Sequence, residues 1–216
     1  LMETASSYIK QYGLKSSLKR AFLRILNPII AVKVDIVLAI SSHKTNSNLN
    51  KEVKVINMSN LQYWRNNRMI NEKTAHRFES FLSNNCIGYY IEENHVLCAW
   101  GFIQIRGEYQ YGSSNIYEIP KDSCVLKNLF VKPEFRGKNY GKLINQARLN
   151  AVPDNCLPIV FVIPENRFAL RNLKILGFEE YLLVKHFLWF KHWCRRKIKI
   201  LRPGEISDKL IEGFNE

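Results

Sequence analysis

The segment LKNLFVKPEFRGKNYGKL, residues 126–143, restricts the fold of this chain more than any other. The apolar run Val125–Val131 that opens it has the composition of a buried β-strand. Pro133 has no N–H group to give to a strand ladder, so we predict that the strand ends just before it. A basic, glycine-containing turn follows and leads into a helix predicted over Tyr140–Ala151.

The turn between this strand and this helix has the features of an anion site. The first turn of a helix leaves backbone N–H groups without partners, and the helix dipole adds partial positive charge there. Glycines let an anion approach the backbone closely. Arg136 and Lys138 add full positive charges. We predict that Arg136–Gly141 binds a phosphate or pyrophosphate; an ordinary basic turn is the alternative.

Periodicity predicts more helices and strands on both sides of this segment. Helices and strands alternate after residue 125, and a strand hairpin precedes them, which indicates a mixed α/β class with a central sheet. The further helices are predicted over Ser16–Leu26, Glu72–Leu82 and Asn166–Leu176. The further strands are predicted over 32–40, Val53–Asn57, Gly88–Ile91, Val96–Ile105, Leu157–Ile163 and Tyr181–Phe190, where the last range holds one strand or a pair of strands.

We divide the chain into three zones. Residues 1–50 hold a basic helix and a first strand that pack on or extend the core. Residues 51–190 form the core, and residues 191–216 form a basic C-terminal extension.

The net charge of +13 is concentrated locally, because the segments 1–33, 127–148 and 185–202 each carry at least six Lys or Arg and at most one acid. Local positive fields attract phosphates, nucleic acid or anionic lipid. A polyphosphate ligand already accounts for part of the charge, so we expect no nucleic-acid partner, while contact of the N-terminal helix with anionic lipid stays open.

The five cysteines form no Cys-x-x-Cys pair, so neither a zinc site nor a disulfide framework is indicated, and no metal is expected. Reduced thiols fit a cytoplasmic protein. No apolar run reaches the roughly 20 residues that a membrane-spanning helix needs.

A second motif narrows the interpretation of the turn. Thirty residues after Arg136 the chain reads NRFALRNLKILGF, from Asn166 to Phe178. The two motifs in this order resemble the signature of the GNAT acyltransferase superfamily over roughly residues 86–190. The matching positions are Val131, Pro133, Arg136-Gly137, Gly141, Asn166, Ala169 and Gly177-Phe178.

The resemblance implies a central, mostly antiparallel sheet that splays open between two parallel strands, with acetyl-CoA or another acyl-CoA as a substrate bound in the opening. Backbone groups of Leu129, Phe130 and Val131 would pair with the pantetheine arm, as an added strand would. Asn166, beside Ala169, would hydrogen-bond along the same arm. The pyrophosphate would be wrapped by Arg136, Gly137, Lys138, Asn139, Tyr140 and Gly141.

Three positions depart from the family pattern. Asn139 replaces a glycine of the turn, and asparagine tolerates the left-handed backbone that the turn needs. Asn128 stands where the family often has an acidic residue; it can orient a proton but cannot take one, so the alternative bases are Glu118, Asp122 and His95. Leu173 stands where a tyrosine often protonates the leaving thiolate, and the alternative acids are Tyr140, Tyr181 and water.

The acceptor is predicted to be a primary amine on a small molecule, with the amino group of a dTDP- or UDP-linked sugar as first choice. This choice follows a resemblance to GNAT members of bacterial surface-polysaccharide pathways. A protein lysine or N-terminus, and a CoA-binding module without catalysis, are the alternatives. A homodimer formed through the apolar C-terminal strand also stays open.

Overall fold

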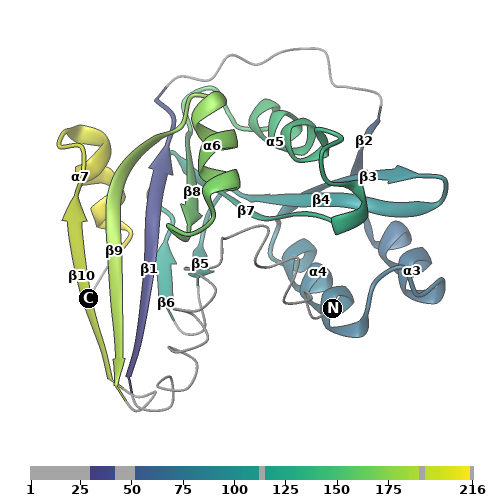
Figure 1. Cartoon of the computed structure of the whole chain (residues 1–216), viewed down its shortest axis with the longest axis horizontal. Helices are drawn as coiled ribbons and strands as arrows, with labels where there is room; N and C mark the ends of the chain where they lie inside the picture. Colours follow the sequence, from purple (N-terminus) through teal and green to yellow (C-terminus); the bar gives the residue numbers. More distant parts are fainter. Residues whose placement is uncertain (1–29, 42–51, 112–114, 190–192, 215–216) are drawn as a thin grey trace. The chain divides into compact units, whose positions relative to one another are not determined.

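The computed structural model describes residues 30–41, 52–111, 115–189 and 193–214 (Figure 1). The predicted helix Ser16–Leu26 lies outside them. The chain divides into two compact units, and the limits predicted for the core at residues 51 and 190 stay predictions. Unit 1 comprises residues 1–40, 110–116 and 160–216; unit 2 comprises residues 41–109 and 117–159.

Unit 2 is built on strands in the order β8-β7-β4-β3-β2. All neighbours are antiparallel except β7 and β8, which are parallel. The strands cover β2 Val53–Ile56, β3 Ile87–Glu93, β4 Val96–Gln104, β7 Ser123–Val131 and β8 Leu157–Val162, of which the last three residues belong to unit 1.

Helices cover both faces of these strands (Figure 1). Trp100 and Phe102 of β4 point toward helices α3 (Met58–Asn66) and α4 (Glu72–Ser83), where Phe78 meets both rings at 5.6 and 4.9 Å between centroids. Gly101 lies between them and faces helix α5 (Tyr140–Asn150), because a Cβ there would stand 2.7 Å from the side chain of Ile144. Because side chains alternate along a strand, one face of β4 presents aromatic rings to α3 and α4, and the other face packs against α5.

The predicted strand Val53–Asn57 is one residue too long, and helix α3 was not predicted. Asn57 is the N-cap of α3: its side chain accepts a hydrogen bond from the Asn60 amide at 2.8 Å, and the Asn60 side chain accepts one from the Asn57 amide. This reciprocal pair begins a helix directly after the strand. The remaining predicted elements of unit 2 agree with the structure within about two residues at each end, the usual uncertainty of such boundaries.

Unit 1 contains three antiparallel strands in the order β10-β9-β1: β1 (Ile30–Ala39), β9 (Glu179–Trp189) and β10 (Trp193–Ile200). Its helices are α6 (Arg167–Ile175) and α7 (Glu205–Glu212). The sequence predicted a final strand or pair of strands over Tyr181–Phe190 and assigned no helix or strand to the basic extension. In the structure the basic segment Trp193–Ile200 forms β10, which pairs with β9 along its length.

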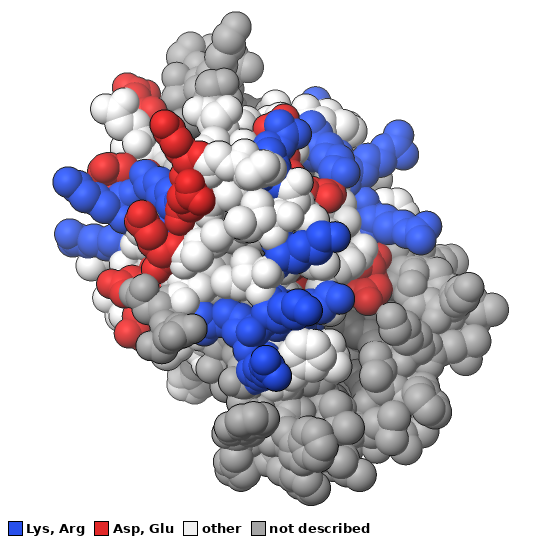
Figure 2. Space-filling model, turned by 90° about the vertical axis from the view of Figure 1, so that its left-hand side faces the viewer, with Lys and Arg blue, Asp and Glu red and all other residues white. Residues whose placement is uncertain are grey.

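The basic residues of β10 lie at the end of the strand order. Arg195, Lys197 and Lys199 are exposed and alternate along the strand. Figure 2 looks onto the side that holds β10 and α7, and shows basic side chains at several places on this face, some of them beside acidic ones. Charged side chains on an outer strand prevent pairing with other chains, which explains part of the C-terminal charge without a ligand.

A two-stranded hairpin, β5 (Glu108–Tyr111) and β6 (Asn115–Glu118), was also not predicted. The mixed α/β class, with mostly antiparallel strand pairs flanked by helices, is confirmed. None of the helices within the described ranges is long and apolar enough to cross a membrane.

Candidate functional site

Strand β7 has two different halves. Its first residues, Ser123–Leu126, are buried, and Ser123–Val125 pairs in parallel with Leu157–Ile159 of β8. Within the described residues, β7 and β8 pair at these three positions only. On the β4 side the ladder continues to Val131, opposite Ala99. The second half, Lys127–Val131, is half-buried or exposed.

A bulge marks the change between the halves. Lys127 lies opposite Phe102 and Phe130 lies opposite Trp100, so β7 has one residue more than β4 in this interval. Asn128 takes the left-handed backbone conformation there, with φ of 54°. Asparagine adopts this conformation more readily than most residues, so the bulge by itself accounts for an asparagine at this position.

The turn after β7 contains two further left-handed residues. A 3-10 turn over Pro133–Phe135 is followed by Arg136 in extended conformation, by Gly137 at φ 91° and by Asn139 at φ 62°. A Cβ on Gly137 would meet nothing within 4 Å, so glycine is required there by the backbone and not by crowding. The left-handed backbone predicted for Asn139 is confirmed.

Helix α5 begins without a side-chain cap. Asn139 is its N-cap residue, but only its carbonyl is used, as acceptor for the amides of Lys142 and Leu143 at 2.9 and 3.1 Å. Within the described residues, no acceptor is recorded for the backbone amides of Gly137–Gly141. These amides are therefore available to hydrogen-bond an anion.

The start of α5 packs against the second half of β7. A Cβ on Gly141 would lie 3.5 Å from Val131 and 4.0 Å from Leu129. The Leu129 side chain is 38% exposed, whereas the Phe130 ring stacks on Trp100 at 4.7 Å between centroids. The predicted loop and the predicted pantetheine-binding residues are thus brought together.

The carboxylate of Glu93, which was not predicted as a site residue, interacts with the positive charge of this loop. Glu93, at the end of β3, accepts hydrogen bonds from Lys138 Nζ at 2.9 Å and from the Tyr140 hydroxyl at 2.7 Å. These two bonds lower the pKa of the Glu93 carboxyl. The bond to Glu93 raises the pKa of Tyr140 to about 12. The Tyr140 hydroxyl therefore stays protonated and donates its hydrogen bond to Glu93.

The other predicted site residues lie on other elements of the fold. Glu118 is exposed on β6, five residues before β7 begins. Asn166 and Ala169 lie in unit 1, where Asn166 is the N-cap of α6 and its side chain accepts from the Ala169 amide at 3.2 Å. Leu173 is a buried residue of α6 and offers no proton.

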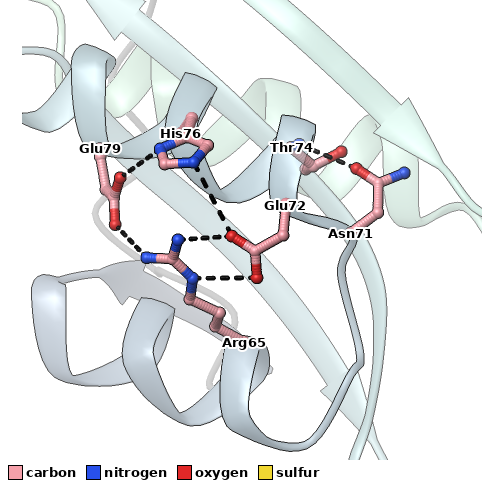
Figure 3. Close-up of polar contacts among 6 residues, drawn as sticks. All are labelled: Arg65, Asn71, Glu72, Thr74, His76 and Glu79. Carbon is pink, nitrogen blue, oxygen red and sulfur yellow. Dashed lines mark hydrogen bonds and ion pairs between the residues drawn. The ribbon is translucent and has the colours of Figure 1, made fainter.

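Several aromatic and basic residues of α3, α4 and β4 have mainly structural contacts. Trp64 and Trp100 lie in the core. Arg65 of α3 and His76 of α4 take part in a polar network with two glutamates (Figure 3). Arg65 donates to Glu72 at 3.1 Å and to Glu79 at 2.9 Å, and His76 Nδ1 is 3.1 Å from Glu79. This network ties α3 to α4.

Four cysteines are buried and take part in no disulfide: Cys86, Cys98, Cys124 and Cys156. The described part of the chain contains no group of three or more His, Cys, Asp or Glu side chains that could hold a metal ion.

No family model matches the chain, and no curated protein sequence matches it. Solved structures do resemble it. A protein of Novosphingobium aromaticivorans, assigned to the acetyltransferases of the GNAT family, has a TM-score of 0.55 at 13% identity, over 73% of this chain and 64% of its own. A Staphylococcus epidermidis protein of unknown function has a TM-score of 0.50 at 11% identity, over 86% of this chain and 80% of its own.

An aminoglycoside N-acetyltransferase in complex with CoA covers 59% of this chain at 23% identity, with a TM-score of 0.44. At these identities the likeness establishes the fold: the chain has the mixed α/β fold of the GNAT acetyltransferases, as predicted. The chain spans less than two thirds of the length of the Novosphingobium protein.

Proposed function

We propose that this chain is an acyl-CoA-dependent N-acyltransferase that moves an acyl group to a primary amine. The observation that carries the proposal is the row of backbone amides at Gly137–Gly141 without recorded acceptors, next to the part of β7 that lies beyond its pairing with β8. A pyrophosphate needs such donors, and an extended amide arm needs an adjacent strand with open hydrogen-bonding groups.

The residues present fit an acyl-CoA. The amides of residues 137–141, together with Arg136 and Lys138, would hold the pyrophosphate. Backbone groups of Leu129–Val131 would pair with the pantetheine amides. The thioester supplies an activated acyl carbon, at which the amine nitrogen forms a bond while the carbon–sulfur bond breaks and a thiol leaves.

Proton transfer is the least specialised part of the proposed site. The amine must lose a proton, and the thiolate must gain one. Asn128 cannot accept a proton, and its position is explained by the bulge. Tyr140 has a pKa of about 12 and donates to Glu93, which makes it a poor base and an acid only if the bond to Glu93 is released. Glu118 stays a candidate base. Alignment of the amine with the thioester would then supply most of the rate enhancement.

Within this activity, we take the amino group of a nucleotide-linked sugar as the acceptor. Lys142 at the start of α5 is an exposed cation that the first pyrophosphate does not use, and it suits a second diphosphate group. Trp64 and Trp100 are buried and offer no open ring to a nucleotide base, so stacking would have to come from other residues. A protein lysine and a small amine without phosphate are the competing acceptors.

The first experiment measures affinity for CoA and acetyl-CoA by calorimetry with wild-type protein, Arg136→Ala and Arg106→Ala. Arg106 is an exposed arginine of unit 2 outside the loop, so its variant controls for net charge. We expect Arg136→Ala to bind about 10 to 100 times more weakly, because a charge-assisted hydrogen bond is lost, and Arg106→Ala to bind like the wild type. Equal affinity for all three proteins would contradict the site.

The second experiment follows thiol release from acetyl-CoA with a panel of amines: nucleotide-linked amino sugars, peptides with a free lysine or N-terminus, and simple amines. Release only with the amino sugars supports the specific proposal, and release with peptides selects the protein acceptor. Tight CoA binding without thiol release on any amine would identify a CoA-binding module that does not catalyse.

A further inference from the structure

One arginine of unit 2 is completely enclosed. Arg148 lies on α5, is 2% exposed and has no carboxylate partner recorded among the described residues. Burying a charge without an ion pair is costly unless its donors are used, so the hydrogen bonds of this side chain indicate what it does.

The guanidinium donates to two backbone carbonyls on neighbouring strands. Arg148 Nη1 lies 3.2 Å from the Phe102 carbonyl of β4 and 3.1 Å from the Lys127 carbonyl of β7. Its Nη2 donates to the Asn145 side chain one turn earlier on α5. Burial lowers the pKa of Arg148 to about 9, so the side chain is still cationic at neutral pH.

These two carbonyls lie directly beside the bulge of β7. Phe102 and Lys127 are the last register partners before it, and Asn128 with its left-handed backbone comes next. Gly101 lies opposite the bulge, and a Cβ there would stand 3.3 Å from Arg148 Cδ and Cζ. The guanidinium thus lies over the place where the ladder is interrupted, in the space that Gly101 leaves.

We propose that Arg148 is a positioning residue that fixes the β7 bulge and thereby sets the backbone orientation of Leu129–Val131 for the acyl donor. This inference rests on the proposed function for its catalytic consequence, but not for its structural part. A bulge leaves carbonyls that the neighbouring strand does not satisfy in the regular pattern. Arg148 of α5 donates hydrogen bonds to two carbonyls beside the bulge, and so stabilises one geometry of the bulge.

The test compares Arg148→Met, Arg148→Lys and Ile144→Val. Methionine keeps much of the length without donors, and replacing a buried charge by an apolar side chain of similar volume is often tolerated by the fold. Lysine keeps a cationic donor. Ile144→Val removes one buried methyl group from the same helix without touching a hydrogen bond, which makes it the matched control.

The structural measurement is hydrogen exchange of the amides of residues 127–131. In Arg148→Met these amides should exchange about ten times faster than in the wild type, with Arg148→Lys in between. In Ile144→Val they should change no more than the rest of the sheet. Unchanged exchange at the bulge in a folded Arg148→Met protein overturns the inference. If Arg148→Met does not fold, Arg148→Lys decides: exchange at residues 127–131 like that of the wild type overturns it.

The kinetic measurement uses an acceptor found with the amine panel. Arg148→Met should lower kcat by about tenfold or more, while CoA affinity, set mainly by the loop at 136–141, changes less than threefold; Arg148→Lys should recover part of kcat. A parallel loss of kcat in Ile144→Val would show general loosening instead. If the wild type neither binds CoA nor releases thiol, the proposed function fails, and the exchange experiment still decides the role of Arg148 in the bulge.

Discussion

The two halves of strand β7 differ in almost every physical property, although they are continuous in sequence. Residues 123–126 are buried, and Ser123–Val125 pairs with β8 on one side, while the ladder to β4 begins at Val125. Residues 127–131 follow a bulge, continue the pairing with β4 and lie beyond the register with β8. The first half contributes to the core, and the second half has polar backbone groups that a ligand can use.

This difference shows how a single strand can contribute to stability in one half and to binding in the other. A fully paired strand has no hydrogen-bonding capacity left, so any site must lie where pairing stops. The bulge at Asn128 and the packing of Gly141 on Leu129 and Val131 bring the amides at the start of α5 to that place. A substitution in the first half should therefore affect unfolding, and one in the second half should affect binding.

The largest effect on stability is expected from Val125→Ala. Val125 is fully buried in the first half, and removing its two methyl groups leaves a cavity, so the free energy of unfolding should fall by about 2–3 kcal/mol. Leu129→Ala in the second half is the matched control, and should cost less than about 1 kcal/mol because Leu129 is 38% exposed. Urea denaturation measures both. Equal losses would show that the two halves do not differ in stability.

An intermediate effect is expected at the boundary between the halves. Asn128→Val places a β-branched residue at φ of 54°, which should cost about 1–2 kcal/mol of unfolding free energy and lower kcat by distorting residues 129–131. Asn128→Gly accepts the same backbone and should change stability by less than about 0.5 kcal/mol.

The two asparagine variants also test for a chemical role. If Asn128 only supports the bulge, Asn128→Gly should retain activity and Asn128→Val should lose it. Activity that is lost in both variants, with CoA binding intact in the glycine variant, would instead assign the Asn128 side chain to the reaction.

Much of this site could be predicted from the sequence, because its backbone is dictated by residues with few conformations. Pro133 ends the strand, Gly137 and Asn139 supply left-handed turns, and α5 starts where predicted. The bulge could not be predicted from a single asparagine in an apolar run, since such a residue equally fits a polar position on a regular strand.

Contacts between distant segments were the other part that sequence reasoning missed. Glu93 reaches Lys138 across 45 positions in the chain, and no local pattern marks it. Arg148 did leave a signal, since it follows Ile144 by four residues and so shares the core-facing side of α5. A charged residue on an apolar helix face indicates that buried hydrogen-bond acceptors lie close to it.

The smallest effect is expected from Glu93→Gln, beside the second half of β7. The Glu93 carboxylate holds Lys138 and Tyr140, and so competes with a phosphate for the same cation. Glutamine removes that negative charge, and CoA should bind about two to five times more tightly, as expected for loss of a partly exposed ion pair. The pKa of Tyr140, about 12 in the wild type because of its bond to Glu93, should fall toward the usual value near 10.

Two measurements distinguish competition between Glu93 and a phosphate from a purely structural role of Glu93. Calorimetry gives the affinity, and the phenolate absorbance during an alkaline titration, with Tyr140→Phe as reference, gives the pKa. Because the pKa of Glu93 is lowered, its carboxylate stays charged throughout the neutral range, so the difference in affinity should persist there and vanish only in acid. Weaker CoA binding by Glu93→Gln would mean that this carboxylate orders the loop for the ligand, and that the second half of β7 depends on β3 as well as on α5.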